Sequence, residues 1–271
     1  MRTKKRLCCV CKRKSIDRLC QRCHVNPFRL EDYRNILALK KDYEELKKWY
    51  KPTLAEIPNL NTPKFWNKKL KSQEFLSDQD GMTQNRIKTV ESFVDRNAKR
   101  ILDIGAGHGY LEEYLSKKRN LKLSGNDFSK ESVQHLRGRF KGDFQVMSIY
   151  NLKYKPKSFD SILILEVLEH IPPKKIFFVL KSLKKLLKPK GQLIISVPTN
   201  EGLERMKANN NGHTRTYTIP LITAELEISG FKVEKIQTLY AFDSNYKFKN
   251  FIAKFYKKWS PNNIIVTTRL I

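Results

Sequence analysis

Short apolar runs alternate with amphipathic stretches from about residue 100 to the end of the chain. The apolar-rich runs predict strands, and they lie at 101–104, 121–127, 144–149, 159–165, 187–198, 231–236 and 264–271. Apolar residues spaced three and four apart predict helices after Pro172 and Pro173 and over residues 219–230. A further stretch, 248–259, combines a helical repeat of aromatic residues with several lysines, a pattern typical of a helix that packs on a sheet, lines a channel or touches an anionic membrane.

The first of these runs leads directly into three glycines at alternate positions, Gly105, Gly107 and Gly109, after which a helical pattern begins. Glycine allows the backbone to bend through positive φ and allows a ligand to approach the main chain. We therefore expect a cofactor at this turn. Glycine-rich turns also occur in nicotinamide and flavin enzymes, where the usual spacing is G-x-G-x-x-G rather than the G-x-G-x-G found here.

The second run ends in Asp127, 18 residues after Gly109. A carboxylate at the tip of the second strand can accept hydrogen bonds from both hydroxyls of an adenosine ribose. Asp127 is therefore the predicted ribose ligand.

Together with the segments 159–171 and 187–198, these motifs resemble the class I S-adenosylmethionine-dependent methyltransferases over residues 80–271. The resemblance implies an α/β, Rossmann-like, seven-stranded and mostly parallel sheet with helices on both faces. It also implies the residues that bind the cofactor S-adenosylmethionine. These are Asp103, near its methionine end, Gly105 and Gly107 along the methionine and ribose, Asp127, Phe128 and Ser148 around the adenosine, and Glu166 beside the cofactor.

A second cluster of chemical groups follows the strand 159–165. Glu166, Glu169 and His170, together with His213 further along the chain, could form a divalent site for Mg²⁺ or Zn²⁺ that would activate an acceptor hydroxyl. The Glu-x-x-Glu-His pattern with a later His resembles ubiquinone-biosynthesis O-methyltransferases and small-RNA 3′-end ribose methyltransferases, whose reactions are metal-assisted. The more conservative interpretation is a metal-free site in which His170 or His213 acts as a general base.

All five cysteines fall within residues 8–23. Two Cys-x-x-Cys pairs, Cys8 with Cys11 and Cys20 with Cys23, supply the four thiolates of a tetrahedral zinc site, in which Cys9 or His24 could replace a neighbour. We therefore expect a zinc-binding module at 1–30. A helix and connector, broken by Pro52, Pro58 and Pro63, follow at 31–79, and the catalytic domain occupies 80–271.

Charge adds a candidate partner. The chain carries 54 basic and 27 acidic residues, a formal net charge of +27, and this excess attracts polyanions unless most of the lysines are simply solvated surface. No apolar run is long enough to span a membrane, and the basic N-terminus has no apolar signal region, so we expect a cytoplasmic enzyme.

These observations predict an S-adenosylmethionine-dependent methyltransferase that acts on oxygen. RNA is the leading expected acceptor because a zinc module and a strong positive charge occur together. A small molecule, either quinone-like, lipid or glycan, is the next alternative. A third is a zinc-dependent nucleic-acid-binding protein whose Rossmann domain is not catalytic.

Overall fold

The computed structural model describes residues 6–7, 14–15, 60–72, 81–118, 121–201, 212–242, 245–253, 255 and 259–270. The predicted zinc ligands Cys8, Cys11, Cys20 and Cys23 lie outside these residues, as does the helix expected from residue 31. Strands β1 (Arg6–Leu7) and β2 (Lys14–Ser15) pair antiparallel.

A seven-stranded mixed sheet forms the centre of the fold, with the strand order β5-β4-β3-β6-β7-β9-β8. Its strands are β3 (Arg100–Ile104), β4 (Lys122–Asp127), β5 (Asp143–Val146), β6 (Phe159–Leu165), β7 (Leu187–Pro198), β8 (Phe231–Leu239) and β9 (Asn263–Leu270). The pairings from β5 to β7 are parallel, and β9 runs antiparallel to both β7 and β8. The predicted seven-stranded, mostly parallel sheet is confirmed.

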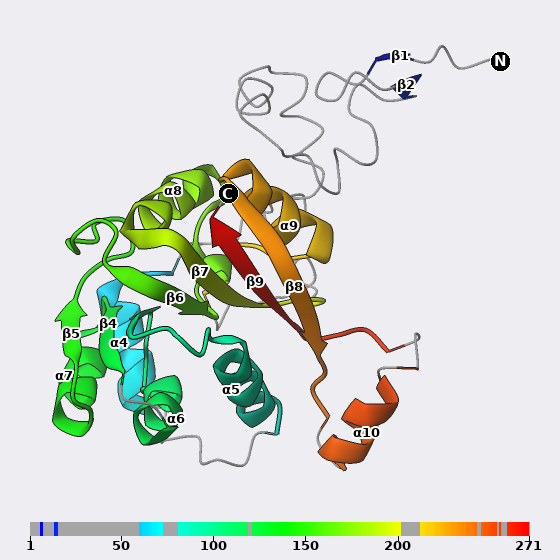
Figure 1. Cartoon of the computed structure of the whole chain (residues 1–271). Helices are drawn as coiled ribbons and strands as arrows, with labels where there is room; N and C mark the ends of the chain where they lie inside the picture. The colour runs from blue at the N-terminus through cyan, green and yellow to red at the C-terminus, as the bar shows by residue number, and fades with distance from the viewer. Residues whose placement is uncertain are drawn as a thin grey trace.

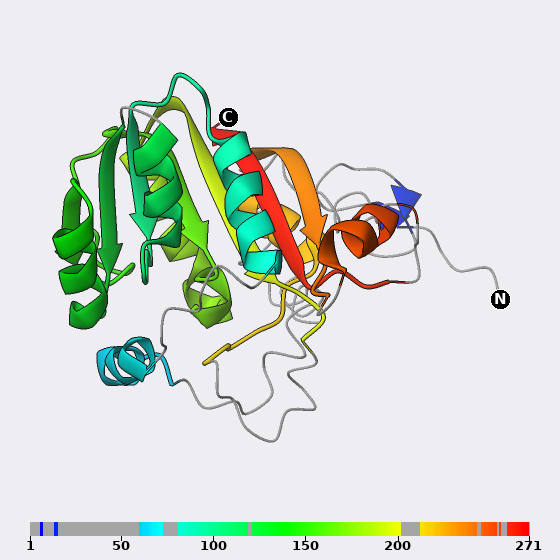
Figure 2. The ribbon, with the colours of Figure 1, turned by 90° about the horizontal axis from the view of Figure 1, so that it is seen from below.

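Helices cover both faces of the sheet (Figures 1 and 2). On one face α5 (Gly81–Phe93) and α6 (Tyr110–Lys118) bury Val90 and Leu115 against Leu163 and Ile194. On the other face α8 (Ile176–Leu186) and α9 (Ile219–Ile228) pack in a second core with alternate residues of the same strands. Because β6 and β7 are covered by helices on both faces, their central segments 162–165 and 193–195 consist entirely of apolar residues.

Helix α7 (Lys130–Arg139) packs beside β5 through Val133, Leu136 and Phe144. Its first turn follows Ser129, whose hydroxyl accepts a hydrogen bond from the Ser132 amide and so caps the helix. Short 3₁₀ helices at Leu168–His170 and Pro173–Lys175 follow β6. Among the described residues, no helix combines the length and the apolar character needed to cross a bilayer.

One expectation about Pro63 is wrong. Pro63 does not break regular structure but is the first residue of α4 (Pro63–Ser72), where its fixed φ suits a helix and its missing N–H has no partner to lose. The hydroxyl of Thr62 accepts a hydrogen bond from the Phe65 amide at 3.2 Å and helps to fix this end of the helix.

The carboxyl ends of β3, β4, β6 and β7 lie at one edge of the sheet because these strands are parallel. Strand β8 also ends there, since two antiparallel pairings through β9 make it parallel to β7. Helix α10 (Tyr246–Ala253) lies between β8 and β9 in the sequence and therefore extends from the same edge. Ligands of open α/β sheets bind at such an edge.

Candidate functional site

The turn after β3 needs glycine at two positions for different reasons. Gly105 has a φ of +74°, and a Cβ there would lie 2.5 Å from Cγ2 of Val167. Gly107 has a φ of +54°, and a Cβ there would meet nothing closer than 3.9 Å. Gly105 therefore permits tight packing of the turn, whereas Gly107 leaves its main chain open to the pocket that both residues line.

Asp127, the last residue of β4, is bound to this turn. Its Oδ2 accepts a hydrogen bond from the Gly107 amide at 3.1 Å, and its Oδ1 accepts one from the Ser129 amide at 2.8 Å. Burial raises the pKa of this carboxyl, and the backbone hydrogen bonds oppose the shift. The predicted ribose ligand thus lies against the glycine turn, with its orientation fixed by two amides.

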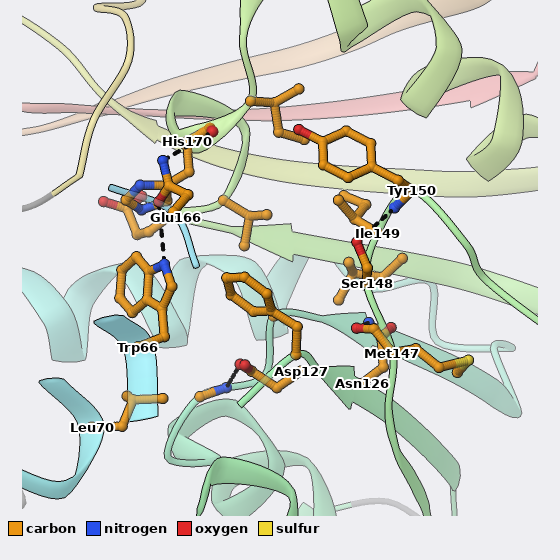
Figure 3. A pocket seen from close by; sticks show the side chains of 17 residues that line it. Trp66, Leu70, Asn126, Asp127, Met147, Ser148, Ile149, Tyr150, Glu166 and His170 are labelled. Carbon is orange, nitrogen blue, oxygen red and sulfur yellow. Dashed lines mark hydrogen bonds between the residues drawn. The ribbon is translucent and has the colours of Figure 1, made fainter. Parts of the chain in front are cut away.

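A single pocket brings most of the predicted cofactor residues together (Figure 3). Its lining includes the predicted residues Gly105, Gly107, Asp127, Phe128, Ser148, Glu166 and His170. Asp103 is different, because it lies buried outside this lining and forms a hydrogen bond with Glu112 of α6.

Helix α4 lines one side of the pocket through Trp66 and Leu70, across from Met147 and Ser148 (Figure 3). The Trp66 indole packs edge-on against the His170 ring with centroids 4.8 Å apart. Asn67 joins the same helix to the start of α7, since its Oδ1 accepts hydrogen bonds from the Ser129 hydroxyl at 2.7 Å and the Lys130 amide at 3.1 Å. The helix therefore bridges the two ends of the pocket.

Asn61, just before α4, connects it to the loops of the second predicted cluster. Its Nδ2 donates to the carbonyl of Gly212 at 2.7 Å and to that of His170 at 3.3 Å. Its Oδ1 accepts from the Trp66 indole at 3.2 Å. One amide side chain thereby ties α4 to two loops that are far apart in the sequence.

Glu166 lies at the end of β6 with a φ of +57°, a conformation uncommon for residues other than glycine. Its Oε1 accepts hydrogen bonds from Ser196 at 2.6 Å and Asn263 at 2.8 Å, and its Oε2 forms an ion pair with Arg86 at 3.1 Å. These contacts hold the carboxylate at the pocket wall. Glu166 is not part of the group formed by the other three candidate metal ligands.

Those three residues, Glu169, His170 and His213, converge, and their ligand atoms lie within 4.8 Å of one another. Glu169 Oε1 is 3.8 Å from His170 Nε2 and 3.9 Å from His213 Nε2. The Glu169 side chain is completely buried, yet neither of its oxygens has a hydrogen-bond partner among the described residues. A buried carboxylate in this state is unfavourable unless a cation compensates its charge or a proton neutralises it, and burial, with the nearby charge of Glu166, raises the pKa of Glu169 well above its usual range.

Neighbouring groups orient both imidazoles toward Glu169. His213 Nδ1 contacts Glu201 Oε1 at 2.6 Å, and His170 Nδ1 lies 3.1 Å from the Gly212 carbonyl. In each ring a partner on Nδ1 leaves Nε2 directed at Glu169, the arrangement that outer carboxylates and carbonyls impose on metal-binding histidines. Burial, aided by the nearby His213, lowers the pKa of His170 to about 3 and keeps the ring neutral, as a ligand must be.

Sequence reasoning missed several residues of this site. They include Asn61, Trp66, Leu70, Arg86, Ser196, Glu201 and Asn263. The sequence carried a signal for α4, because Thr62-Pro63 is a favourable helix start and Trp66 and Leu70 are spaced one turn apart. It carried none for Arg86 or Asn263, whose partners are distant in the chain.

Comparison with known proteins agrees with this geometry. The family model described as a methyltransferase domain matches residues 75–236. A ubiquinone biosynthesis O-methyltransferase of Idiomarina loihiensis is 35% identical over 105 residues, which cover 36% of this chain and 42% of the relative. A demethylmenaquinone methyltransferase of Thermotoga maritima is 30% identical over 115 residues, which cover 42% of this chain and 49% of the relative.

The chain thus spans about half the length of the curated relatives it matches. Among solved structures, an N-methyltransferase of Bradyrhizobium japonicum in complex with S-adenosyl-L-homocysteine superposes with a TM-score of 0.57. Its identity is 14%, and the match covers 76% of this chain and 98% of that one. At this identity the likeness shows the fold.

Proposed function

Because this chain belongs to the methyltransferase-domain family, we propose that it transfers a methyl group from S-adenosylmethionine to an oxygen of a flat small molecule, with help from a metal ion. The observation that carries the proposal is the convergence of Glu169, His170 and His213 beside a pocket built on the glycine turn and Asp127. Because the chain retains both the candidate metal ligands and the candidate donor-binding residues, an active enzyme is favoured over a non-catalytic binding protein.

The chain's residues fit the methyl donor. Asp127 would accept hydrogen bonds from the ribose hydroxyls, and the open main chain of Gly107 would let the donor approach closely. Phe128 and Ser148 line the side of the pocket that would hold the adenine, where the serine hydroxyl can accept a hydrogen bond. The sulfonium of the donor supplies an activated methyl group, so the protein's main task is to align that methyl with the acceptor oxygen.

The remaining pocket lining indicates the class of acceptor. Trp66, Leu70, Ile149, Tyr150 and Ile171 are aromatic or aliphatic, and none of the described lining residues is Lys or Arg. Such a surface suits a planar apolar ring better than a polyanion. The names of two relatives, which refer to ubiquinone biosynthesis and demethylmenaquinone, also favour the small-molecule alternative over RNA, which the sequence had placed first.

The metal cluster would act on the acceptor hydroxyl. A divalent ion held by Glu169, His170 and His213 would be a Lewis acid that lowers the pKa of a bound hydroxyl. Two imidazole nitrogens favour a transition metal such as Zn²⁺ over Mg²⁺, which prefers an all-oxygen shell. Glu201 would then hold His213 in the ligating orientation.

Labelled S-adenosylmethionine tests the acceptor. The full chain is incubated separately with a quinone-containing lipid extract, with simple catechols and with RNA, and label is counted in each product. We expect label in the small phenolic or quinol fraction. Label confined to RNase-sensitive material would contradict the proposed acceptor, and no transfer to any fraction would contradict the activity.

The metal is tested with Glu169→Gln and His213→Gln, compared with Glu131→Gln at an exposed position of α7. We expect both cluster variants to lose the bound ion and to lower kcat by roughly a hundredfold or more, because the hydroxyl is no longer polarised. Affinity for S-adenosylmethionine should stay within about twofold, since Asp127 is intact. Full activity after chelation would instead support a metal-free histidine base.

A further inference from the structure

We propose that the outer face of α10 docks the protein onto a membrane surface that contains anionic lipids. This proposal concerns a surface outside the pocket and does not depend on the identity of the methyl acceptor. It develops one of the roles that the sequence pattern of residues 248–259 left open.

Three phenylalanines form an exposed stripe on this face. Phe248 is 66% exposed, Phe251 is 59% exposed, and Phe255, just beyond the helix, is 74% exposed. Their spacing of three and four residues places them on one side of the helix, and the rings of Phe251 and Phe255 contact each other with centroids 5.6 Å apart. A contiguous group of large exposed apolar side chains usually marks an interaction surface.

The opposite side of α10 is anchored, so the exposure of the stripe is a property of the folded helix. The Tyr246 hydroxyl accepts a hydrogen bond from Asn85 of α5 at 3.2 Å, and the Tyr246 ring packs where a Cβ on Gly81 would lie 2.8 Å away. Ala253 is buried. Figure 1 shows α10 extending beyond the end of β8, with its attachment to the body of the protein on one side.

The charge of the chain segment that carries the stripe indicates the kind of surface. Residues 240–262 contain five lysines and one acid, Asp243, together with eight aromatic residues. Lys247 is exposed on the same side as Phe251. Aromatic rings inserted at the level of lipid headgroups, with lysines paired to anionic lipids, are the features of helices that lie in a membrane interface.

Helix α10 lies at the same edge of the sheet as the pocket, so docking through α10 would bring the pocket close to the membrane. Asn263, the first residue of β9 after the α10 segment, donates a hydrogen bond to Glu166 at the pocket wall, and Arg86 of α5 forms an ion pair with the same carboxylate. Docking through α10 would therefore hold the carboxyl edge of the sheet close to the lipid surface. An acceptor dissolved in the membrane would then reach the pocket without crossing bulk water.

Sedimentation with lipid vesicles tests the proposal on the full chain. We expect binding to vesicles of phosphatidylcholine mixed with phosphatidylglycerol and much weaker binding to phosphatidylcholine alone, with strong salt dependence. The triple variant Phe248→Ser, Phe251→Ser, Phe255→Ser should bind about tenfold or more weakly, because the inserted apolar area is lost. Lys247→Glu should weaken binding to the anionic vesicles only.

Two matched controls make the test specific. Phe178→Ser removes a phenylalanine of α8 that is 53% exposed, and Lys232→Glu reverses an exposed charge at the opposite edge of the sheet. Neither should change vesicle binding, and all variants should retain wild-type affinity for S-adenosylmethionine, which shows that they fold. Unchanged binding by the triple variant would overturn the proposal. So would an α10-dependent preference for single-stranded RNA or α10-dependent self-association in place of vesicle binding.

Discussion

At the scale of single residues, Asp127 should control affinity for the methyl donor. Asp127→Asn keeps an acceptor for one backbone amide but removes the charge that would hold the ribose hydroxyls. We expect the Kd for S-adenosylmethionine, measured by calorimetry, to rise by roughly tenfold to a hundredfold, the usual worth of hydrogen bonds to a charged group.

Asp160→Asn is the matched control for this prediction. The Asp160 carboxylate accepts hydrogen bonds from the amides of Lys99 and Arg100, at the edge of the sheet away from the pocket. Asp160→Asn removes the charge that pairs with Lys188 at 2.6 Å and should leave the Kd for S-adenosylmethionine unchanged. If both variants bind the donor as tightly as the wild type, Asp127 is not the ribose ligand.

Individual residues were predictable where a local pattern imposed their chemistry. Gly105 and Gly107 follow β3, Asp127 ends β4, and all three line the pocket. The role of Glu166 was not predictable, because a cofactor ligand and a metal ligand both fit the same Glu-x-x-Glu-His motif. Its contacts with Arg86 and Asn263, 80 and 97 residues away in the chain, decide which group its oxygens face.

At the scale of elements, β3 and α6 share a buried pair of acids that should make stability depend on pH. Burial raises the pKa of Asp103 to about 7, and burial together with the charge of Asp103 raises the pKa of Glu112 well above its usual range. The folded protein therefore retains protons that the unfolded chain releases. For Asp103 the resulting loss of stability begins near the ordinary carboxyl pKa of about 4 and is complete slightly above pH 7.

Asp103→Asn should reduce this dependence, because asparagine stays neutral. We expect Tm to fall less between pH 5 and pH 8 in the variant than in the wild type. Glu113→Gln on the same helix is the control. Its carboxyl has a lowered pKa, mainly through a hydrogen bond from Lys117, and it is ionised in both states across this range. An equal fall in Tm for wild type and Asp103→Asn would contradict a raised pKa of Asp103 in the folded protein.

The elements themselves were largely predictable, because strand and helix periods are local properties. The position of β9 between β7 and β8 was not, since no local pattern states which strands pair. Helix α4 was not predictable from Pro63 alone, because proline interrupts regular structure at most positions yet also begins helices, as it does here. The missed helix carries Trp66 and Leu70, so an error in one element removed one wall of the expected site.

At the scale of the whole molecule, zinc binding by the N-terminal cysteines should be independent of donor binding in the pocket. Every described residue that lines the pocket lies at Asn61 or later, and the four paired cysteines precede residue 24. We therefore expect Cys8→Ser, Cys11→Ser to lose about one equivalent of zinc from the full chain, because two thiolates cannot complete a tetrahedral site. Its Kd for S-adenosylmethionine should stay within about twofold of wild type, whereas Glu169→Gln should lose metal without affecting the zinc held by the cysteines.

A double variant that keeps all its zinc would show that the cysteine pairs are not ligands. One that loses donor affinity would show that the module supports the pocket through contacts beyond the residues described.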